Sequence, residues 1–114
     1  MNRATAYQFS TAEGHRFSGA RDASGHGHLH SFDDEPAVIY ADGSQWWYEN
    51  GNVSRRGDKP AVVWANGVVE YWIDGVRQRE GGPAVIFSAD DRVHPDVRGA
   101  RQFWEHGVMV RMER

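Results

Sequence analysis

One short phrase, Pro-Ala-Val followed by an aliphatic and an aromatic residue, occurs three times in this chain. The copies begin at Pro36, Pro60 and Pro83, so their starts are 24 and 23 residues apart. A fixed spacing of roughly 20 to 50 residues is typical of repeat architectures, in which each unit stacks on its neighbours. Such an array presents a series of similar surfaces, which suits binding better than catalysis.

Each unit contains two apolar runs separated by a turn signal. In the first unit the runs 37–41 and 44–49 flank Asp42-Gly43, and Asn50-Gly51 follows. Asp-Gly and Asn-Gly between apolar runs predict β-hairpins, because both central residues of a type I′ turn need positive φ. The later units repeat the signal at Asn66-Gly67, Asp74-Gly75 and His106-Gly107.

These patterns predict an all-β fold of tandem β-hairpin repeats, with a period of about 24 residues, joined into a curled antiparallel meander sheet. Residues 33–114 hold three hairpin units, and the third carries an insertion around 91–99. We interpret residues 1–32 as a degenerate first repeat or N-terminal cap, because a terminal repeat faces water on one side. At 114 residues the chain fits a single domain.

The second run of each unit carries aromatic side chains in two columns. Neighbouring residues of a strand point to opposite faces, so the two columns belong to opposite sides of the sheet. A single sheet cannot hide both, and we therefore expect strong curl and at least one face left for a partner or a second subunit. The columns are Trp47, Tyr71 and Phe103, and Tyr48, Trp72 and Trp104.

Charge is unevenly distributed along the chain. The formal net charge is −3, which argues against direct nucleic-acid binding. Five acidic residues and no basic residue lie between 33 and 50, whereas Arg and Lys predominate from 51 to 79. Two interpretations stay open: adjacent repeats attract each other through opposite charges, or the acidic segment forms a patch that engages a basic partner.

Arginine recurs at one position of each unit, four residues after the glycine that ends the second turn. Arg55, Arg79 and Arg111 occupy this position. They predict either a structural ladder, in which each guanidinium pairs with a carboxylate or carbonyl of the next repeat, or a cationic stripe for phosphate or an acidic protein.

Three histidines alternate in the segment Gly-His-Gly-His-Leu-His. In an extended strand His26, His28 and His30 would point to one face, where three imidazoles could hold a zinc ion. The strand spacing, however, sets such ligands roughly 6–7 Å apart, which is awkward for one ion without a bend. Structural or solvent-exposed histidines are therefore the favoured interpretation, and no cofactor is expected.

The segments 46–53, 70–77 and 102–109 share an aromatic-x-x-Gly spacing that resembles the variant form of MORN repeats. The resemblance covers residues ~27–114. It implies a stack of hairpins that acts as a binding module, and some bacterial proteins of this kind are labelled antitoxins.

The combined expectation is a non-catalytic protein-binding module. We expect a small acidic inhibitor of a toxin or defence nuclease, of antitoxin or phage anti-CRISPR type, that acts by steric occlusion of a basic nucleic-acid-binding protein. Exposed Trp and Arg commonly anchor such contacts. The candidate contact residues are Asp33, Asp34, Glu35, Asp42, Glu49, Trp46, Trp64, Arg55 and Arg79.

Two alternatives come from other classes of protein. One is a structural or assembly protein that forms a homodimer through an aromatic face, and the other is a metal-dependent enzyme that uses the three histidines. The absence of cysteine fits a reducing cytoplasm, and the lack of an apolar run of about 18 residues argues against a membrane span.

Overall fold

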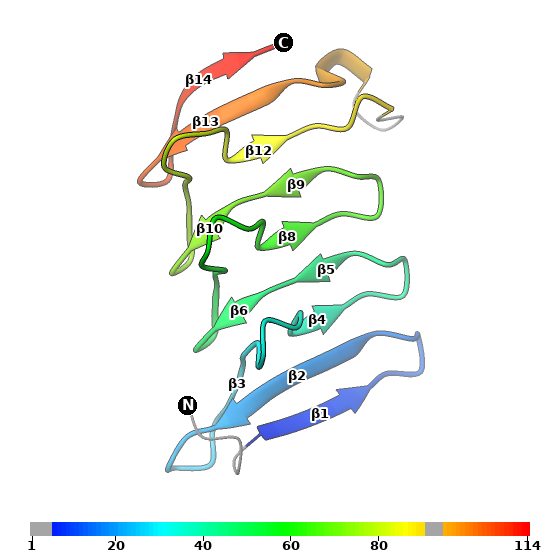
Figure 1. Ribbon diagram of the computed structural model, residues 1–114. Coiled ribbons are helices and arrows are strands. Elements are labelled where there is room, and N and C mark those ends of the chain that lie inside the picture. Colours follow the sequence, from blue (N-terminus) through cyan, green and yellow to red (C-terminus); the bar gives the residue numbers. More distant parts are fainter. Residues whose placement is uncertain (1–5, 91–94) are drawn as a thin grey trace.

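The computed structural model describes residues 6–90 and 95–114 as a stack of antiparallel β-hairpins (Figure 1). This confirms the all-β class and the antiparallel meander, and the sheet stays open. In the part of the chain that is described, no helix has the length and apolarity to cross a bilayer.

Nine strands form the path of the main sheet, each antiparallel to its neighbour, and β3 pairs with β2 beside that path. Most strands of the middle units are only two residues long because each strand soon changes partner. In order along the sheet the strands are β1 (Ala6–Ser10), β2 (Arg16–Arg21), β4 (Val38–Ile39), β5 (Gln45–Trp46), β8 (Val62–Val63), β9 (Val69–Glu70), β12 (Val85–Ile86), β13 (Arg101–Glu105) and β14 (Val108–Glu113), with β3 spanning Gly27–Leu29.

Two short hairpins branch from the main sheet. One joins β6 (Tyr48–Glu49) to β7 (Asn52–Val53), and the other joins β10 (Trp72–Ile73) to β11 (Val76–Arg77). They arise where the chain exchanges partners: the Trp47 amide donates to the carbonyl of Ala61 (2.7 Å), whereas the Tyr48 carbonyl accepts from Ser31 (2.7 Å). The prediction of one strand over 44–49 is therefore wrong, because these residues serve two sheets.

The second turn of each unit has the geometry that its sequence predicts. Both residues of Asn50-Gly51, Asp74-Gly75 and His106-Gly107 have positive φ, as a type I′ turn requires.

The first turns are different. At Asp42-Gly43 and Asn66-Gly67 only the glycine has positive φ, so the type I′ prediction is wrong there. The Tyr40 amide bonds to the Ser44 carbonyl across a three-residue loop, and the Asp42 carboxylate accepts from the Ser44 amide (2.8 Å). A loop of this length favours a type I turn followed by a left-handed glycine.

The repeated Pro-Ala-Val phrase forms the most buried part of the sheet. Val38 and Val62 are at most 1% exposed, and Ala37, Ala61 and Ala84 are equally buried. Val38 and Val62 both pair with Trp46, whereas Val62 and Val85 both pair with Glu70. The three copies therefore occupy equivalent places in the sheet.

The N-terminal hairpin departs from the later units at Gly19. The carbonyl of Ser18 accepts a hydrogen bond from the His30 amide, and in the next unit the carbonyl of Trp47 accepts one from the Ser54 amide. Ser18 and Trp47 are therefore equivalent, and Gly19 occupies the position of Tyr48. A Cβ atom at Gly19 would collide with the carbonyl oxygen of His28 and would lie 2.6 Å from the Tyr7 hydroxyl. The Tyr7 ring covers this site from β1, and only glycine leaves room for it.

The last strand fills the place of a further unit. Met112 of β14 pairs with Gln102 in the same way that Val85 pairs with Glu70. The insertion predicted around 91–99 lies partly outside the described residues, since 91–94 are not included. Its second part forms a 3₁₀ helix, η2 (Pro95–Val97), before the fully buried Ala100.

Candidate functional site

One face of the main sheet carries most of the aromatic rings. Cross-strand pairing places one residue of each strand in a single row on this face, which we call the aromatic face. The row contains Phe9, Phe17, Val38, Trp46, Val62, Glu70, Val85, Gln102 and Met112.

Edge-to-face ring contacts connect the first units along this face. Tyr40 lies between Phe17 and Trp46, with ring centroids 6.5 and 6.4 Å away, and Trp46 meets Trp64 at 5.4 Å. Such pairs contribute about 0.5–1.5 kcal/mol each beyond their buried area. Trp46 and Trp64, predicted as contact residues, are therefore neighbours on one surface, and Trp64 remains 36% exposed.

A buried carboxylate interrupts the aromatic row beyond Trp64. Glu70 stands where Trp46 stands in the preceding unit, and it is only 8% exposed. Its two oxygens accept from the indole nitrogens of Trp64 (2.6 Å) and Trp72 (3.0 Å). The Arg77 guanidinium completes the set at 2.8 Å. One carboxylate thus orients two tryptophans and one arginine.

Arg77 contacts aromatic rings from two neighbouring units. Its guanidinium carbon lies 4.9 Å from the Trp72 ring and 4.6 Å from the Trp104 ring. Because Glu70 neutralises this guanidinium, the centre of the aromatic face carries no net charge from the pair.

A groove of about 590 Å³ opens beside this centre. It forms because Glu70 and Gln102 occupy row positions that Phe17 and Trp46 fill with rings in the earlier units. The volume falls within the roughly 300–1,000 Å³ of typical ligand pockets. The groove is lined by Trp64, Asn66, Val68, Glu70, Arg77, Val85, Phe87, Gln102, Trp104 and Met109.

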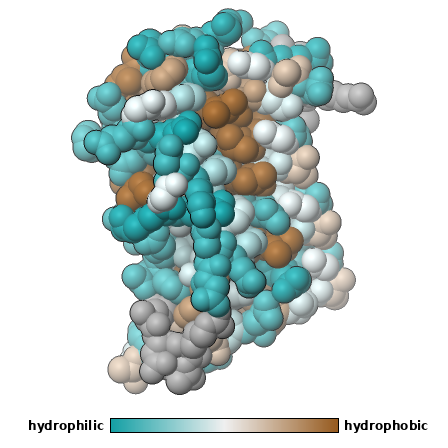
Figure 2. All heavy atoms as spheres, in the orientation of Figure 1, coloured by the Kyte–Doolittle hydropathy of each residue, from teal (hydrophilic) through white to brown (hydrophobic). Residues whose placement is uncertain are grey.

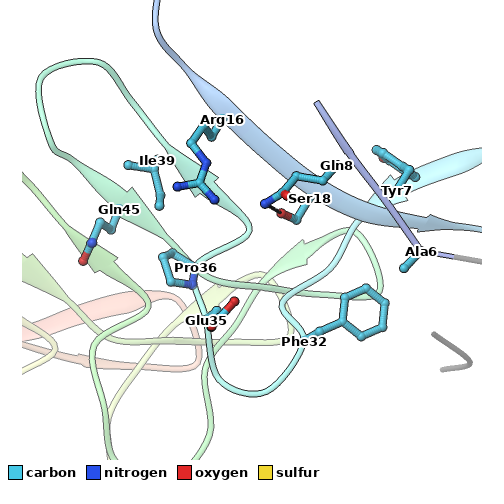
Figure 3. Close-up of a pocket in the computed structure, with 10 residues that line it drawn as sticks. All are labelled: Ala6, Tyr7, Gln8, Arg16, Ser18, Phe32, Glu35, Pro36, Ile39 and Gln45. Carbon is cyan, nitrogen blue, oxygen red and sulfur yellow. Dashed lines mark hydrogen bonds between the residues drawn. The ribbon is translucent and has the colours of Figure 1, made fainter. Parts of the chain in front are cut away.

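The opposite face of the sheet carries aliphatic and polar residues. Val63, Val69 and Ile86 are neighbours in its central row and are half-buried. Figure 2 shows an apolar patch on the face turned to the viewer, over β8, β9 and β12. Towards the N-terminal hairpin, Arg16, Ile39 and Gln45 line a hollow of mixed polarity (Figure 3).

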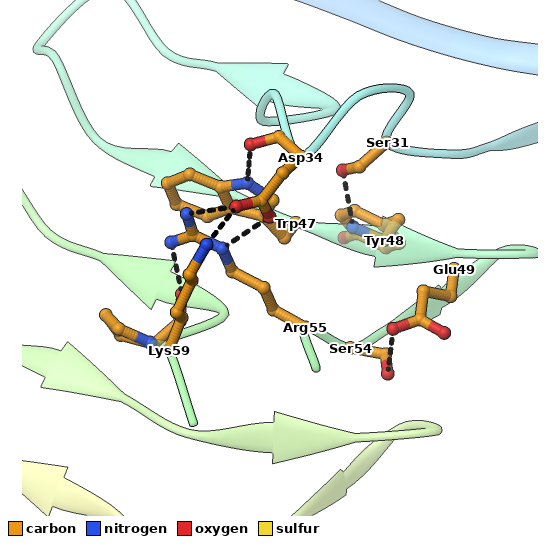
Figure 4. A network of polar contacts seen from close by, with 9 residues as sticks. Ser31, Asp34, Trp47, Tyr48, Glu49, Ser54, Arg55 and Lys59 are labelled. Carbon is orange, nitrogen blue, oxygen red and sulfur yellow. Dashed lines mark hydrogen bonds and ion pairs between the residues drawn. The ribbon is translucent and has the colours of Figure 1, made fainter. Parts of the chain in front are cut away.

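The recurrent arginines form a structural ladder between units. Arg55 stacks 3.9 Å from the centre of the Trp47 ring and donates two hydrogen bonds to the Asp34 carboxylate (2.8 and 3.1 Å; Figure 4). It also donates to the Pro60 carbonyl (3.1 Å), and Lys59 binds the same carboxylate at 2.7 Å. Hydrogen bonds from Arg55 and Lys59 hold the pKa of Asp34 well below its usual range.

The next unit repeats this arrangement, and the last one lacks its carboxylate. Arg79 stacks 3.9 Å from the Tyr71 ring and pairs with Asp58 at 2.8 Å. Arg111 stacks over Phe103 at 4.1 Å, but it pairs with Glu113 of its own strand.

The acidic segment is largely used within the chain. Asp34 pairs with Arg55 and Lys59, and Glu49 pairs with Arg56, which also reaches Asp74. These contacts are the attraction between adjacent units that the alternating charge predicts.

The remaining acidic candidates lie in turns and loops. Asp42 lies in the turn at the far end of the β4–β5 hairpin, and Glu35 is exposed before Pro36. Asp33 has a left-handed backbone, with φ of 55°, in the same loop as Glu35. The structure therefore does not gather the five acidic candidates into one patch.

Two of the three histidines serve local hydrogen bonds. His26 Nδ1 lies 2.8 Å from the Ser24 hydroxyl, and His30 Nδ1 accepts from the Asn50 amide at 3.0 Å. His28 Nε2 is buried with no hydrogen-bond partner. Within residues 6–90 and 95–114, no group of three His, Asp or Glu side chains is arranged to hold a metal ion.

The His30 contact predicts a loss of stability in mild acid. Burial lowers the pKa of His30 below the 6.5 of a free histidine, so the unfolded chain takes up the proton first. The contribution of neutral His30 to the free energy of unfolding should therefore be complete above pH 6.5 and should decline as the pH falls below 6.5. Ser54, the equivalent residue, accepts from the Asp74 amide without titrating. In thermal unfolding at pH 7.5 and 5.5, His30→Ser should lose less stability than the wild type, and equal losses would contradict this role.

Sequence reasoning did not identify Glu70 and Arg77 as functional residues. The signal in the sequence was that an acidic residue, Glu70, stands after two valines at the position where the preceding unit has Trp46. Its partners are Trp64 directly after β8, Trp72 of β10 and Arg77 of β11, and only the bend between the two sheets brings them together.

Searches of protein-family models, curated proteins and solved structures yield no match to this chain. The geometry of the aromatic face is therefore the basis for a functional assignment.

Proposed function

We propose that this chain is a non-catalytic protein-binding module whose contact surface is the aromatic face. The observation that carries the proposal is Trp64, which is exposed and is fixed by its hydrogen bond to Glu70 beside the groove. A pre-oriented tryptophan next to a groove of mixed apolar and polar lining is typical of binding hot spots, because little side-chain entropy is lost on contact.

The proposed mode of action is steric occlusion by an inhibitor. Strands from the central and C-terminal units contribute to the groove, so a bound partner would lie across much of the face. The net charge of −3 favours a basic partner, such as a nuclease or toxin with a nucleic-acid groove. Because the chain neutralises Asp34, Glu49 and Glu70 internally, we propose that aromatic contacts supply most of the affinity and net charge supplies steering.

Affinity capture from the native cell, followed by titration of the captured protein, tests this function. Trp64→Ser should weaken partner binding about thirtyfold, corresponding to about 2 kcal/mol for a hot-spot residue. Val63→Thr is the matched control, because Val63 is the adjacent residue on the opposite face and the change is nearly isosteric. Equal binding by the Trp64 variant would overturn the proposed surface, provided that both variants melt like the wild type.

A further inference from the structure

The two outer edges of the main sheet differ in chemistry. Among residues 6–90 and 95–114 the sheet begins at β1 and ends at β14, so within this part of the chain each of these strands has a neighbour on one side only. Six large hydrophobic side chains are classed as exposed among the described residues, and four of them belong to β14. They are Val108, Met109, Val110 and Met112, with exposures from 37% to 63%.

The opposite edge exposes fewer large hydrophobic side chains. On β1 the exposed residues include Gln8 and Ser10, and Phe9 is the one exposed large hydrophobic residue of that strand. Tyr7 turns inward over Gly19. Edge strands with exposed apolar residues pair readily with further strands.

The charges on β14 favour a particular partner. Arg111 and Glu113 lie on the same face of the strand, with Met112 between them on the aromatic face. A bulge interrupts the regular pairing at Val110, so the regular stretch is Arg111–Glu113. Within one copy Glu113 pairs with Arg111 and with Arg101, both at 3.1 Å. If a second copy pairs antiparallel with Met112 opposite Met112, each Arg111 also faces the Glu113 of the other copy, so the charges of the two strands alternate in sign across the contact. The alternative register centred on Arg111 would place two like charges opposite each other.

We propose that two copies of this chain associate through their β14 strands in this self-complementary register, forming one continuous sheet. The interface is isologous, so it closes as a dimer and leaves both β1 edges outside. The row of the aromatic face would then continue from Met112 of one copy into the second copy. This interface is separate from the centre of the aromatic face, where Trp64 and Glu70 lie, and the two proposals can fail independently.

Sedimentation equilibrium over a concentration range on the order of a hundredfold tests the proposal. The wild type should be a dimer that dissociates on dilution. Arg111→Glu alone and Glu113→Arg alone should each raise the dimer Kd about tenfold or more, because two attractive cross-strand pairs become repulsive. An equimolar mixture of the two variants should restore a dimer, since each acidic side chain of the mixed pair then faces a basic one.

Several outcomes would overturn the edge-to-edge dimer. A wild type that is monomeric throughout would do so, as would a mixture that associates no better than either variant alone. If the charge reversals leave the dimer intact and Trp64→Ser abolishes it, the interface lies on the aromatic face instead. Gln8→Arg on β1 is the control and should leave the Kd unchanged; weakened association there would indicate pairing between β14 and β1.

Discussion

Replacing Glu70 by alanine is expected to lower the free energy of unfolding by about 3–4 kcal/mol, the largest effect predicted for this chain. The substitution removes the acceptor for two indole N–H groups and the counter-charge of Arg77. A partly buried guanidinium between Trp72 and Trp104 would then lack its carboxylate. Loss of one member of a buried ion pair costs more than the pair contributes, because the remaining charge stays desolvated.

The prediction is tested by comparing the free energies of unfolding of Glu70→Ala and Gln102→Ala in urea. Gln102 occupies the same row one unit later, and its amide oxygen accepts from one indole, that of Trp104 (3.0 Å). We expect Gln102→Ala to cost about 1 kcal/mol, the usual net value of one hydrogen bond. Similar losses in the two variants would show that Glu70 is not the centre of the network.

Replacing Arg55 by alanine is expected to cost about 2–3 kcal/mol. The Arg55 side chain is 16% exposed, covers the Trp47 ring and donates to the Pro60 carbonyl. Most of the loss should come from the uncovered ring and the unpaired carbonyl. The ion pair itself contributes less, because the Asp34 side chain is 43% exposed and water screens it.

Arg111→Ala is the matched control for this substitution. Arg111 also stacks on an aromatic ring, at 4.1 Å, but the side chain is 59% exposed and its carboxylate partner is in the same strand. We expect a loss below about 1 kcal/mol. Thermal unfolding of both variants, at a concentration where both are monomeric, tests this difference. An equal loss of stability in Arg111→Ala and Arg55→Ala would contradict the ladder.

Much of the fold was predictable because its signals are local. Asn50-Gly51, Asp74-Gly75 and His106-Gly107 predicted their turns because backbone φ depends on the residues in the turn. The alternation of Trp47 and Tyr48 predicted opposite faces, and the structure places Trp47 beside Arg55 and Tyr48 beside Trp46.

The candidate site was less predictable because its interactions join different units. Trp46 and Trp64 were identified, but their ring contact and the groove depend on how the units stack. The acidic candidates were interpreted as a patch or as repeat-to-repeat pairs, and composition cannot distinguish them. The distances from Asp34 to Arg55 and Lys59 make the difference, because a carboxylate held at 2.7–2.8 Å by two cations has little charge left for a partner.

The sequence by itself determined the all-β class, the tight turns of the small hairpins and the equivalence of the three Pro-Ala-Val phrases. These properties follow from φ preferences and from the two-residue alternation of a strand, which act over a few neighbouring residues. Only the tertiary structure decided the bends at Trp47 and Tyr71, the burial of Glu70 among its donors, and the exposed apolar edge of β14. Each of these depends on which strand lies alongside another, and that choice is made by packing between residues far apart in the chain.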